Sequence, residues 1–196
     1  RSDLAKKGGK NCDVLVMSAT PIPRTMMMAL YGDMDISKLS EKPSGRKKIL
    51  TLSKPENKIN ELWPFMKKQI DLEKQIFWVC PLIEESSFLN YSSAIKRFHL
   101  LEEKFPDKVG LIHGGLEKNE KEKVLNKFLT KETSILVSTT VIEVGIDFPN
   151  ANLIVIDNAN KFGLSQLHQL RGRVGRGNSQ GTCILLFKKD LSKNAV

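Results

Sequence analysis

The amino-acid sequence predicts an α/β fold built on a mostly parallel central sheet flanked by helices. Short, nearly continuous apolar segments alternate along the chain with segments whose apolar residues recur at helical spacing. Strands that are covered on both faces read as continuous apolar runs, whereas half-exposed strands alternate. Such strands in alternation with helices indicate a three-layer sandwich, with the sheet in the middle layer.

The apolar runs predict strands over residues 14–17, 76–79, 109–112, 135–137, 153–156 and 183–187. The helical patterns between them predict helices over residues 59–70, 94–104 and 117–129, and a short helix over 26–30. In the segment 117–129, Val124, Leu125 and Phe128 recur at helical spacing, and Glu117 stands four residues before Lys121. Two prolines precede residues 26–30, where they favour a helix start.

The chain of 196 residues is long enough for one domain and a fragment of another. Residues 38–48 are polar and contain Pro43 and Gly45, which predicts a linker. Residues 1–37 hold one strand and one helix, too little for a core of their own, whereas residues 49–196 are the size of a domain. Because the chain opens on Arg1 without an initiator methionine, we expect it to be a piece of a longer protein.

Lys and Arg number 31 and Asp and Glu 22, which gives a net charge of +9. This surplus indicates either a polyanionic partner or an inert basic surface. Cys12, Cys80 and Cys183 are far apart and form no CxxC pair, so we expect buried, reduced thiols and no metal site. The longest apolar run falls far below the roughly 18 residues of a membrane span, and we expect a cytoplasmic protein without a membrane partner.

The first polar segment with chemical potential follows the predicted strand 14–17. It offers the hydroxyls of Ser18 and Thr20 at the carboxyl end of a strand, where ligands bind in open α/β sheets. An ordinary strand-to-helix cap remains the alternative interpretation.

The second segment, residues 138–147, follows another apolar strand. The hydroxyls of Thr139 and Thr140 and the backbone N–H groups near Gly145 suit phosphate oxygens, and the carboxylate of Asp147 suits ribose hydroxyls. A polar loop without a ligand is the alternative.

The third segment, residues 166–177, interleaves three arginines with glycines. On a helix, Arg173 and Arg176 would share a face, as would Gln169 and Arg173. Two guanidinium groups that point the same way suit a triphosphate. The alternative is a solvated basic helix, which would rarely space glycines in this way.

Together the three segments resemble motifs of the superfamily 2 helicases and translocases. Ser18-Ala19-Thr20 resembles motif III, residues 138–147 motif V, and Gln169 to Arg176 motif VI. Residues 75–86 resemble the motif IV region, and His113-Gly114-Gly115 resembles the loop that touches the nucleic-acid backbone. The resemblance implies that residues 49–196 form a C-terminal RecA-like helicase lobe and that residues 1–37 are left over from the first lobe.

The segment 19–25 resembles a branch of this superfamily whose members act on stalled replication forks or on stalled transcription. The segments 31–35 and 43–47 resemble specifically the members that remodel stalled forks and Holliday junctions in recombination and repair. The resemblance implies catalytic roles for Arg173, Arg176 and Gln169, and ATP binding by Gly145, Asp147 and the two arginines. It further implies DNA contacts at Gly114, Thr139 and Thr140, and coupling through Ser18 and Thr20.

No phosphate-binding GxxxxGK[ST] loop and no Asp-Glu-x-His motif occur in the sequence. By resemblance, the first RecA-like lobe of the parent chain would supply both and hold Mg²⁺, so we expect this piece alone to be inactive. The implied partners are branched DNA, the first lobe and a wedge domain. The alternatives are a translocase of the same branch that acts on stalled transcription, and a non-catalytic lobe that only binds nucleic acid or protein.

Overall fold

The computed structural model describes residues 17, 37, 47–82, 91–139, 151–175 and 180–188. The chain divides into two compact units, residues 1–41 and 42–196. All the helices and strands described below belong to the second unit. The division falls within residues 38–48, for which the sequence predicts a linker. Apart from Met17, the strand and helix expected over 14–17 and 26–30 lie outside the described residues.

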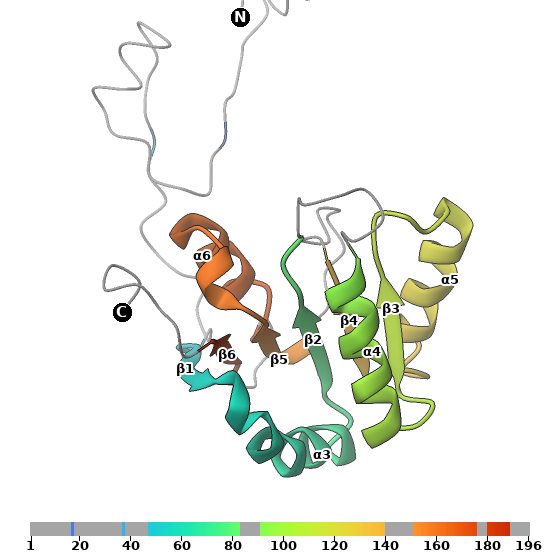
Figure 1. The fold of residues 1–196 in the computed structure, drawn as a ribbon, viewed down its shortest axis with the longest axis horizontal. Coiled ribbons are helices and arrows are strands. Elements are labelled where there is room, and N and C mark those ends of the chain that lie inside the picture. Colours follow the sequence, from blue (N-terminus) through green and yellow to red (C-terminus); the bar gives the residue numbers. More distant parts are fainter. Residues whose placement is uncertain are drawn as a thin grey trace, which may run out of the picture. The chain divides into compact units, whose positions relative to one another are not determined.

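A six-stranded sheet forms the middle layer, and every pair of neighbouring strands is parallel (Figure 1). The order across the sheet is β1-β6-β5-β2-β4-β3. The parallel α/β prediction is therefore confirmed. The strands are β1 Leu50–Pro55, β2 Gln75–Val79, β3 Val109–Ile112, β4 Ile135–Ser138, β5 Ala151–Ile156 and β6 Thr182–Phe187.

The sequence pattern did not predict β1. This strand lies at one edge of the sheet, and its first four residues are exposed or half-exposed, Leu50 and Leu52 among them. An edge strand that is half exposed carries no continuous apolar run, which is the signal that predicts the other strands. Its pairing with β6 is nevertheless regular from Leu50 with Thr182 to Pro55 with Phe187.

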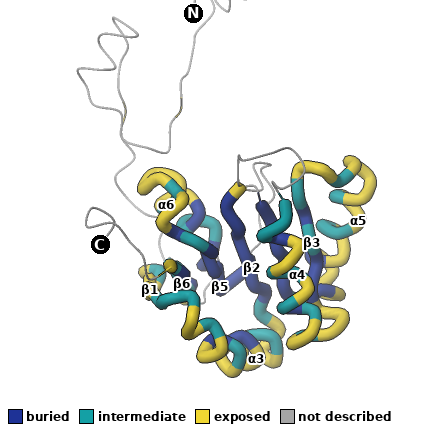
Figure 2. The backbone as a smooth tube through the Cα atoms, viewed as in Figure 1, coloured by how far each residue is buried: buried dark blue, intermediate teal, exposed yellow. Residues whose placement is uncertain are grey.

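Helices cover both faces of the sheet (Figure 2). One face packs against η1 Glu56–Leu62, α3 Trp63–Asp71 and α4 Ser92–Lys104, and the other against α5 Lys118–Leu129, η2 Ala159–Lys161 and α6 Leu164–Arg171. The helix expected over 59–70 is divided, because the chain runs as a 3₁₀-helix to Leu62 and as an α-helix only from Trp63, where Pro64 occupies the first turn.

The central strand β2 divides the core into two layers. Ile76 and Trp78 point towards α3 and α4, and Phe77 and Val79 towards α5 and α6, as the alternation of side chains along a strand requires. Phe77 meets Phe128 of α5 with ring centroids 5.4 Å apart. Every residue of β2, β4 and β5 is buried, which accounts for the continuous apolar runs in the sequence.

Because all strands are parallel, their carboxyl ends meet at one edge of the sheet. Cys80, His113, Thr139 and Asp157 are the residues that follow β2, β3, β4 and β5 at this edge. Backbone hydrogen bonds join the ends: Asp157 N–H donates to the Val79 carbonyl at 2.8 Å, and Cys80 N–H donates to the Ser138 carbonyl at 2.8 Å. Ligands of open α/β sheets bind at this edge.

Candidate active site and nucleic-acid interface

The loop after β3 lies beside the end of β4. Ile112 is in register with Ser138, and the Thr139 N–H donates to the Ile112 carbonyl at 3.3 Å. Two of the residues expected to contact nucleic acid, Gly114 and Thr139, are therefore brought to the same part of the carboxyl edge. Thr140, the third, lies outside the described residues.

Side chains from α4 and α5 hold this loop. The imidazole of His113 stacks on the ring of Tyr91, the residue before α4, with centroids 4.6 Å apart and planes 28° apart. From α5, Lys121 Nζ donates to the Gly114 carbonyl at 3.2 Å. Gly114 and Gly115 are exposed, so the loop presents backbone rather than side chains to solvent.

Two polar atoms near this loop are buried and make no hydrogen bond within the described part of the chain: His113 Nδ1 and Thr139 Oγ1. Burial, with a smaller contribution from Lys121, lowers the pKa of His113 below its usual value, which keeps the imidazole neutral at physiological pH. The Nδ1 atom of a neutral imidazole can donate or accept one hydrogen bond, and a hydroxyl can do both, so both atoms have hydrogen-bonding capacity that the described residues do not use. Because both atoms are buried, neither faces solvent in this structure.

Only the first part of the arginine segment, up to Arg171, is helical. α6 ends at Arg171, and Gly172 closes it with an N–H that donates to the His168 carbonyl at 3.1 Å. Arg173 therefore lies beyond the helix, and the expectation that Gln169, Arg173 and Arg176 share helical faces is wrong for Arg173. Glycine is a poor helix former, which explains the early end. Arg176 lies outside the described residues.

Arg173 is instead held between two buried neighbours. Leu170 and Val174 are 2% and 0% exposed, and the Arg173 N–H donates to the Leu170 carbonyl at 3.0 Å. Further along, Gly175 donates its N–H to the Ala151 carbonyl at the start of β5 at 3.2 Å. The backbone around Arg173 is thus anchored to the sheet, while its side chain remains partly exposed.

The glycine spacing of this segment, interpreted from the sequence as a sign of function, also has a structural cause. Gly175 has φ +67°, and a Cβ atom there would lie 2.9 Å from the backbone nitrogen of Gly181. A side chain at either position would force two backbones apart. Gly181 in turn accepts a hydrogen bond from the Leu50 N–H at 2.9 Å, which ties the segment to β1.

Of the other predicted site residues, Gln169 is exposed on α6, and the nearby Arg171 reaches His168 Nδ1 at 3.2 Å. Gly145 and Asp147, expected at the nucleotide, lie outside the described residues, as do Ser18 and Thr20. Their roles stay predictions.

A buried charge network at the end of β5 was not predicted from the sequence. Asp157, whose side chain is 4% exposed, accepts a hydrogen bond from Arg97 Nε of α4 at 2.8 Å. Arg97 also reaches Glu56 Oε1 of η1 at 3.0 Å and lies over the ring of Trp78, 5.2 Å from its centroid. Trp78 Nε1 donates to the same Asp157 oxygen at 3.4 Å.

This network fixes the start of the connection that leads to α6. Asn158, the next residue, adopts the left-handed conformation with φ 46°, and η2 follows. An acid after an apolar strand was visible in the sequence, but its partner Arg97 is 60 residues away, and no spacing signal connects the two.

The two cysteines in the described part of the chain are buried thiols, as the sequence predicted. Cys80 and Cys183 are free and buried, and burial raises the pKa of both, that of Cys183 to about 11. Cys12 lies outside the described residues. The part of the chain that the structure describes contains no group of three or more His, Cys, Asp or Glu side chains suited to a metal ion. None of the described helices is long and apolar enough to cross a membrane.

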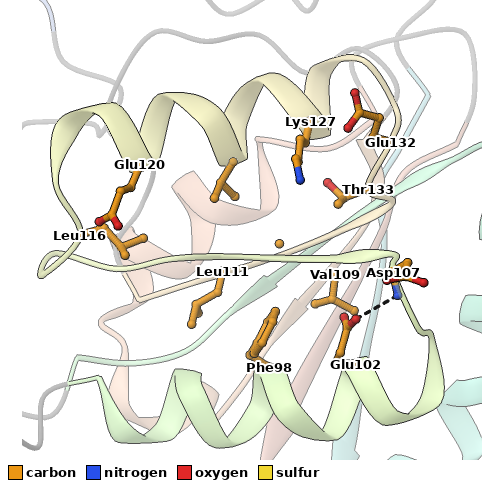
Figure 3. Close-up of a pocket in the computed structure, with 12 residues that line it drawn as sticks. Phe98, Glu102, Asp107, Val109, Leu111, Leu116, Glu120, Lys127, Glu132 and Thr133 are labelled. Atoms are coloured by element: carbon orange, nitrogen blue, oxygen red, sulfur yellow. Dashed lines mark hydrogen bonds between the residues drawn. The ribbon is translucent and has the colours of Figure 1, made fainter.

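A groove of about 520 Å³ runs beside the edge strand β3, between α4 and α5 (Figure 3). Its floor is apolar, with Phe98, Val109 and Leu111, and its rim carries more acidic groups than basic ones: Glu102, Asp107, Glu120 and Glu132 against Lys127. None of the predicted site residues lines it. Because a negative rim repels phosphates, we do not assign nucleic acid to this groove.

The described part of the chain thus combines a parallel sheet, a glycine loop at the carboxyl edge of that sheet, and an arginine segment that is anchored at the start of β5. The profile of the helicase conserved C-terminal domain matches residues 58–178, and the chain belongs to this family.

Within the family, the chain is similar to the ATP-dependent DNA helicase RecG. It is 51% identical to RecG of Thermotoga maritima over 91% of this chain and 23% of that protein, and 47% identical to RecG of Bacillus subtilis over 95% and 27%. The chain thus spans about a quarter of the length of these relatives. The branch that the sequence resembled is the one to which RecG belongs.

Solved structures agree. The structure of RecG bound to a three-way DNA junction superimposes with a TM-score of 0.78 and 46% identity, over 96% of this chain and 24% of that one. The C-terminal domain of the DEAD-box protein Dbp5 superimposes with a TM-score of 0.51 at 20% identity, over 77% of this chain and 81% of that one. The second comparison shows the shared fold alone.

Proposed function

We propose that this chain is the C-terminal RecA-like lobe of a RecG-like, ATP-dependent DNA helicase that remodels branched DNA. The single observation that carries this proposal is the match to RecG bound to a three-way junction, with 46% identity over nearly the whole chain. Bacterial relatives support a role in the cytoplasm, at stalled forks and junctions in recombination and repair.

In this proposal, ATP binds between this lobe and the first lobe of the same protein. The first lobe holds Mg²⁺ and the phosphates, because the sequence here has no phosphate-binding loop. This lobe contributes Gly145 and Asp147 at the nucleotide, and Arg173, Arg176 and Gln169 at its phosphates. As the bond to the γ-phosphate breaks, charge spreads over its oxygens, and a fixed guanidinium stabilises that charge.

The anchoring of Arg173 supports this role. Leu170, whose carbonyl accepts the Arg173 N–H, and the following residue Val174 are buried, and Gly175 is bonded to β5. Arg173 therefore has a fixed backbone and a partly exposed side chain. A charge that is held in place before the reaction stabilises the transition state without the cost of reorganisation.

The loop after β3 and the end of β4 would bind the DNA backbone. The exposed backbone of Gly114 and the hydroxyl of Thr140 suit phosphate oxygens, and such contacts carry no sequence preference. The hydroxyl of Thr139 is buried in this structure, so in this proposal it contacts DNA only once the loop above it moves. Ser18 and Thr20 would couple the two sites, and a wedge domain of the same protein would contact the branch point.

The test is the ATPase activity of the full-length protein with forked and with linear DNA of equal length. We expect turnover to rise much more with forked than with linear DNA. Equal stimulation by both would contradict a branched-DNA function, and activation only in the presence of stalled RNA polymerase would favour a transcription-coupled translocase. A protein that binds forked DNA without turnover would leave only the non-catalytic binding lobe. The 196-residue chain alone should release no phosphate above background.

A further inference from the structure

The two glycines of the loop after β3 pack against one aromatic ring. A Cβ atom on Gly114 would lie 2.8 Å from the hydroxyl oxygen of Tyr91, and a Cβ atom on Gly115 would lie 3.1 Å from Tyr91 Cε2. Carbon atoms of real side chains essentially never approach a neighbour to 2.8 Å, and 3.1 Å is tight. With Tyr91 in this position, the loop has room for glycine but not for a larger residue at either position.

The ring of Tyr91 is not free to move aside. It stacks on the imidazole of His113, which belongs to the same loop, with centroids 4.6 Å apart. Its backbone is fixed at the start of α4, where the Tyr91 carbonyl accepts a hydrogen bond from the Ile95 N–H at 2.9 Å. From the opposite helix, Lys121 Nζ holds the Gly114 carbonyl at 3.2 Å. The loop is thus fixed between α4 and α5.

Such fixing matters for a loop that binds through its backbone. A hydrogen bond from an N–H group weakens steeply once the donor angle departs from the preferred range, so a backbone donor must be aimed before the ligand arrives. Gly114 and Gly115 are exposed and have no side chain that could adjust to a phosphate. Their geometry is set instead by the residues beneath them.

We propose that Tyr91 is a positioning residue for nucleic-acid binding, which holds the His113–Gly115 loop in its binding geometry. The proposal rests on the proposed function, because it takes this loop as part of the DNA interface. It makes a specific prediction about the Tyr91 hydroxyl, which is the one atom among the described residues that lies within 3 Å of the Cβ position at Gly114.

The test uses the full-length protein and the dissociation constant for forked DNA without nucleotide. Gly114→Ala should weaken binding about ten-fold, because the new methyl group displaces the loop. Tyr91→Phe alone should stay within about two-fold of wild type, since the ring and its stacking remain. In the double variant Tyr91→Phe/Gly114→Ala, the nearest ring atoms lie 3.4 Å from the methyl group, an ordinary contact, and binding should return to within about three-fold of wild type.

Gly115→Ala is the matched control. Its closest neighbours are Tyr91 Cε2 at 3.1 Å and His113 Nδ1 at 3.2 Å, and the substitution Tyr91→Phe retains both. Tyr91→Phe should therefore not rescue Gly115→Ala. The melting temperature of each variant shows whether lost binding merely reflects lost folding.

Restoration of DNA binding in the Gly114 double variant but not in the Gly115 double variant would support the proposal. If Tyr91→Phe restores DNA binding in both double variants, or in neither, the role proposed for Tyr91 is wrong. The proposed function would still stand in that case, provided that the wild-type protein shows fork-stimulated turnover. A wild-type protein that neither binds forked DNA nor hydrolyses ATP in its presence would overturn both.

Discussion

The two halves of the candidate site are built in opposite ways. After β3, the chain offers exposed glycine backbone beside the buried Thr139 at the end of β4, and Tyr91 and Lys121 support the loop. After β5, it buries a charge: Asp157 is paired with Arg97 under the connection that leads to the arginine segment.

The difference follows from what each half is proposed to hold. A surface that must accept nucleic acid of any sequence is best made of backbone groups, which contact phosphates and read no bases. An arginine that acts on one phosphate needs a fixed position, and buried residues on either side of it provide that. The candidate site therefore has a backbone half, which follows β3 and β4, and an arginine half, which runs from the end of β5 to Gly175. Each of the following predictions tests one of them.

The largest effect is expected at Arg173. In the full-length protein, Arg173→Ala should lower DNA-stimulated ATPase turnover by a hundred-fold or more, because arginine fingers contribute on the order of 10³ to 10⁵ in rate. Arg173→Lys keeps the charge but loses the planar guanidinium, so it should rescue only partly. Arg171→Ala, two residues earlier on α6 and paired with His168, is the control and should stay within a few-fold. Near-normal turnover of Arg173→Ala would remove it from the catalytic machinery.

The buried network of the arginine half can be broken at Arg97. Arg97→Met leaves Asp157 buried without its charged partner and should lower the free energy of unfolding of the 196-residue chain by about 3–5 kcal/mol in urea titrations. Lys131→Met, which breaks an exposed pair with Glu73, is the control and should change it by less than about 1 kcal/mol. If Arg97→Met lowers the free energy of unfolding no more than Lys131→Met does, the network is not needed to hold β5 and α4 together.

DNA binding by the backbone half should respond strongly to salt. If it neutralises about four phosphates of a single strand, affinity should fall roughly fifty-fold between about 50 and 200 mM salt, since the slope is about −0.7 for each phosphate. If Lys121 also approaches a phosphate, Lys121→Met should make the salt slope shallower by the value for one phosphate, about 0.7. Binding that does not change with salt would mean that the net charge of +9 serves another purpose.

The smallest effect concerns pH. Burial, helped by Lys121, lowers the pKa of His113 in the folded chain from its ordinary value of 6.5, so the folded state binds its proton less readily than the unfolded state. Its contribution to stability is present above pH 6.5 and is lost as the pH falls below that value towards the folded pKa. Urea titrations at several pH values should show that His113→Gln flattens this part of the stability profile. Equal profiles for wild type and His113→Gln would contradict this.

Most of the fold could be predicted from the sequence, and the reason lies in burial. β2, β4 and β5 are buried throughout, so their apolar runs were unambiguous, whereas the exposed edge strand β1 gave no such run. In the candidate site, only residues that directly follow a predicted strand could be placed from the sequence. Gly114 and Thr139 lie where their positions after two strands predict them, because neighbouring parallel strands end together.

The parts that could not be predicted depend on contacts distant in sequence or on the backbone. The pairing of Arg97 with Asp157 joins residues 60 positions apart, and nothing in their local sequence links them. The end of α6 at Arg171 depends on Gly172 and on the positive φ of Gly175. The helical spacing of the arginines in the sequence contains no information about this end. The stacking of Tyr91 on His113 arises only when α4 packs beside β3.

The central claim is that the two halves of the candidate site perform separate tasks, and one measurement tests it directly. The dissociation constant of full-length Arg173→Ala for forked DNA, without nucleotide, should stay within about three-fold of wild type while turnover is lost, because the DNA contacts lie at the other half. If Arg173→Ala instead retains turnover and loses affinity for forked DNA about ten-fold or more, the arginine segment binds DNA, and the assignment of tasks to the two halves is wrong.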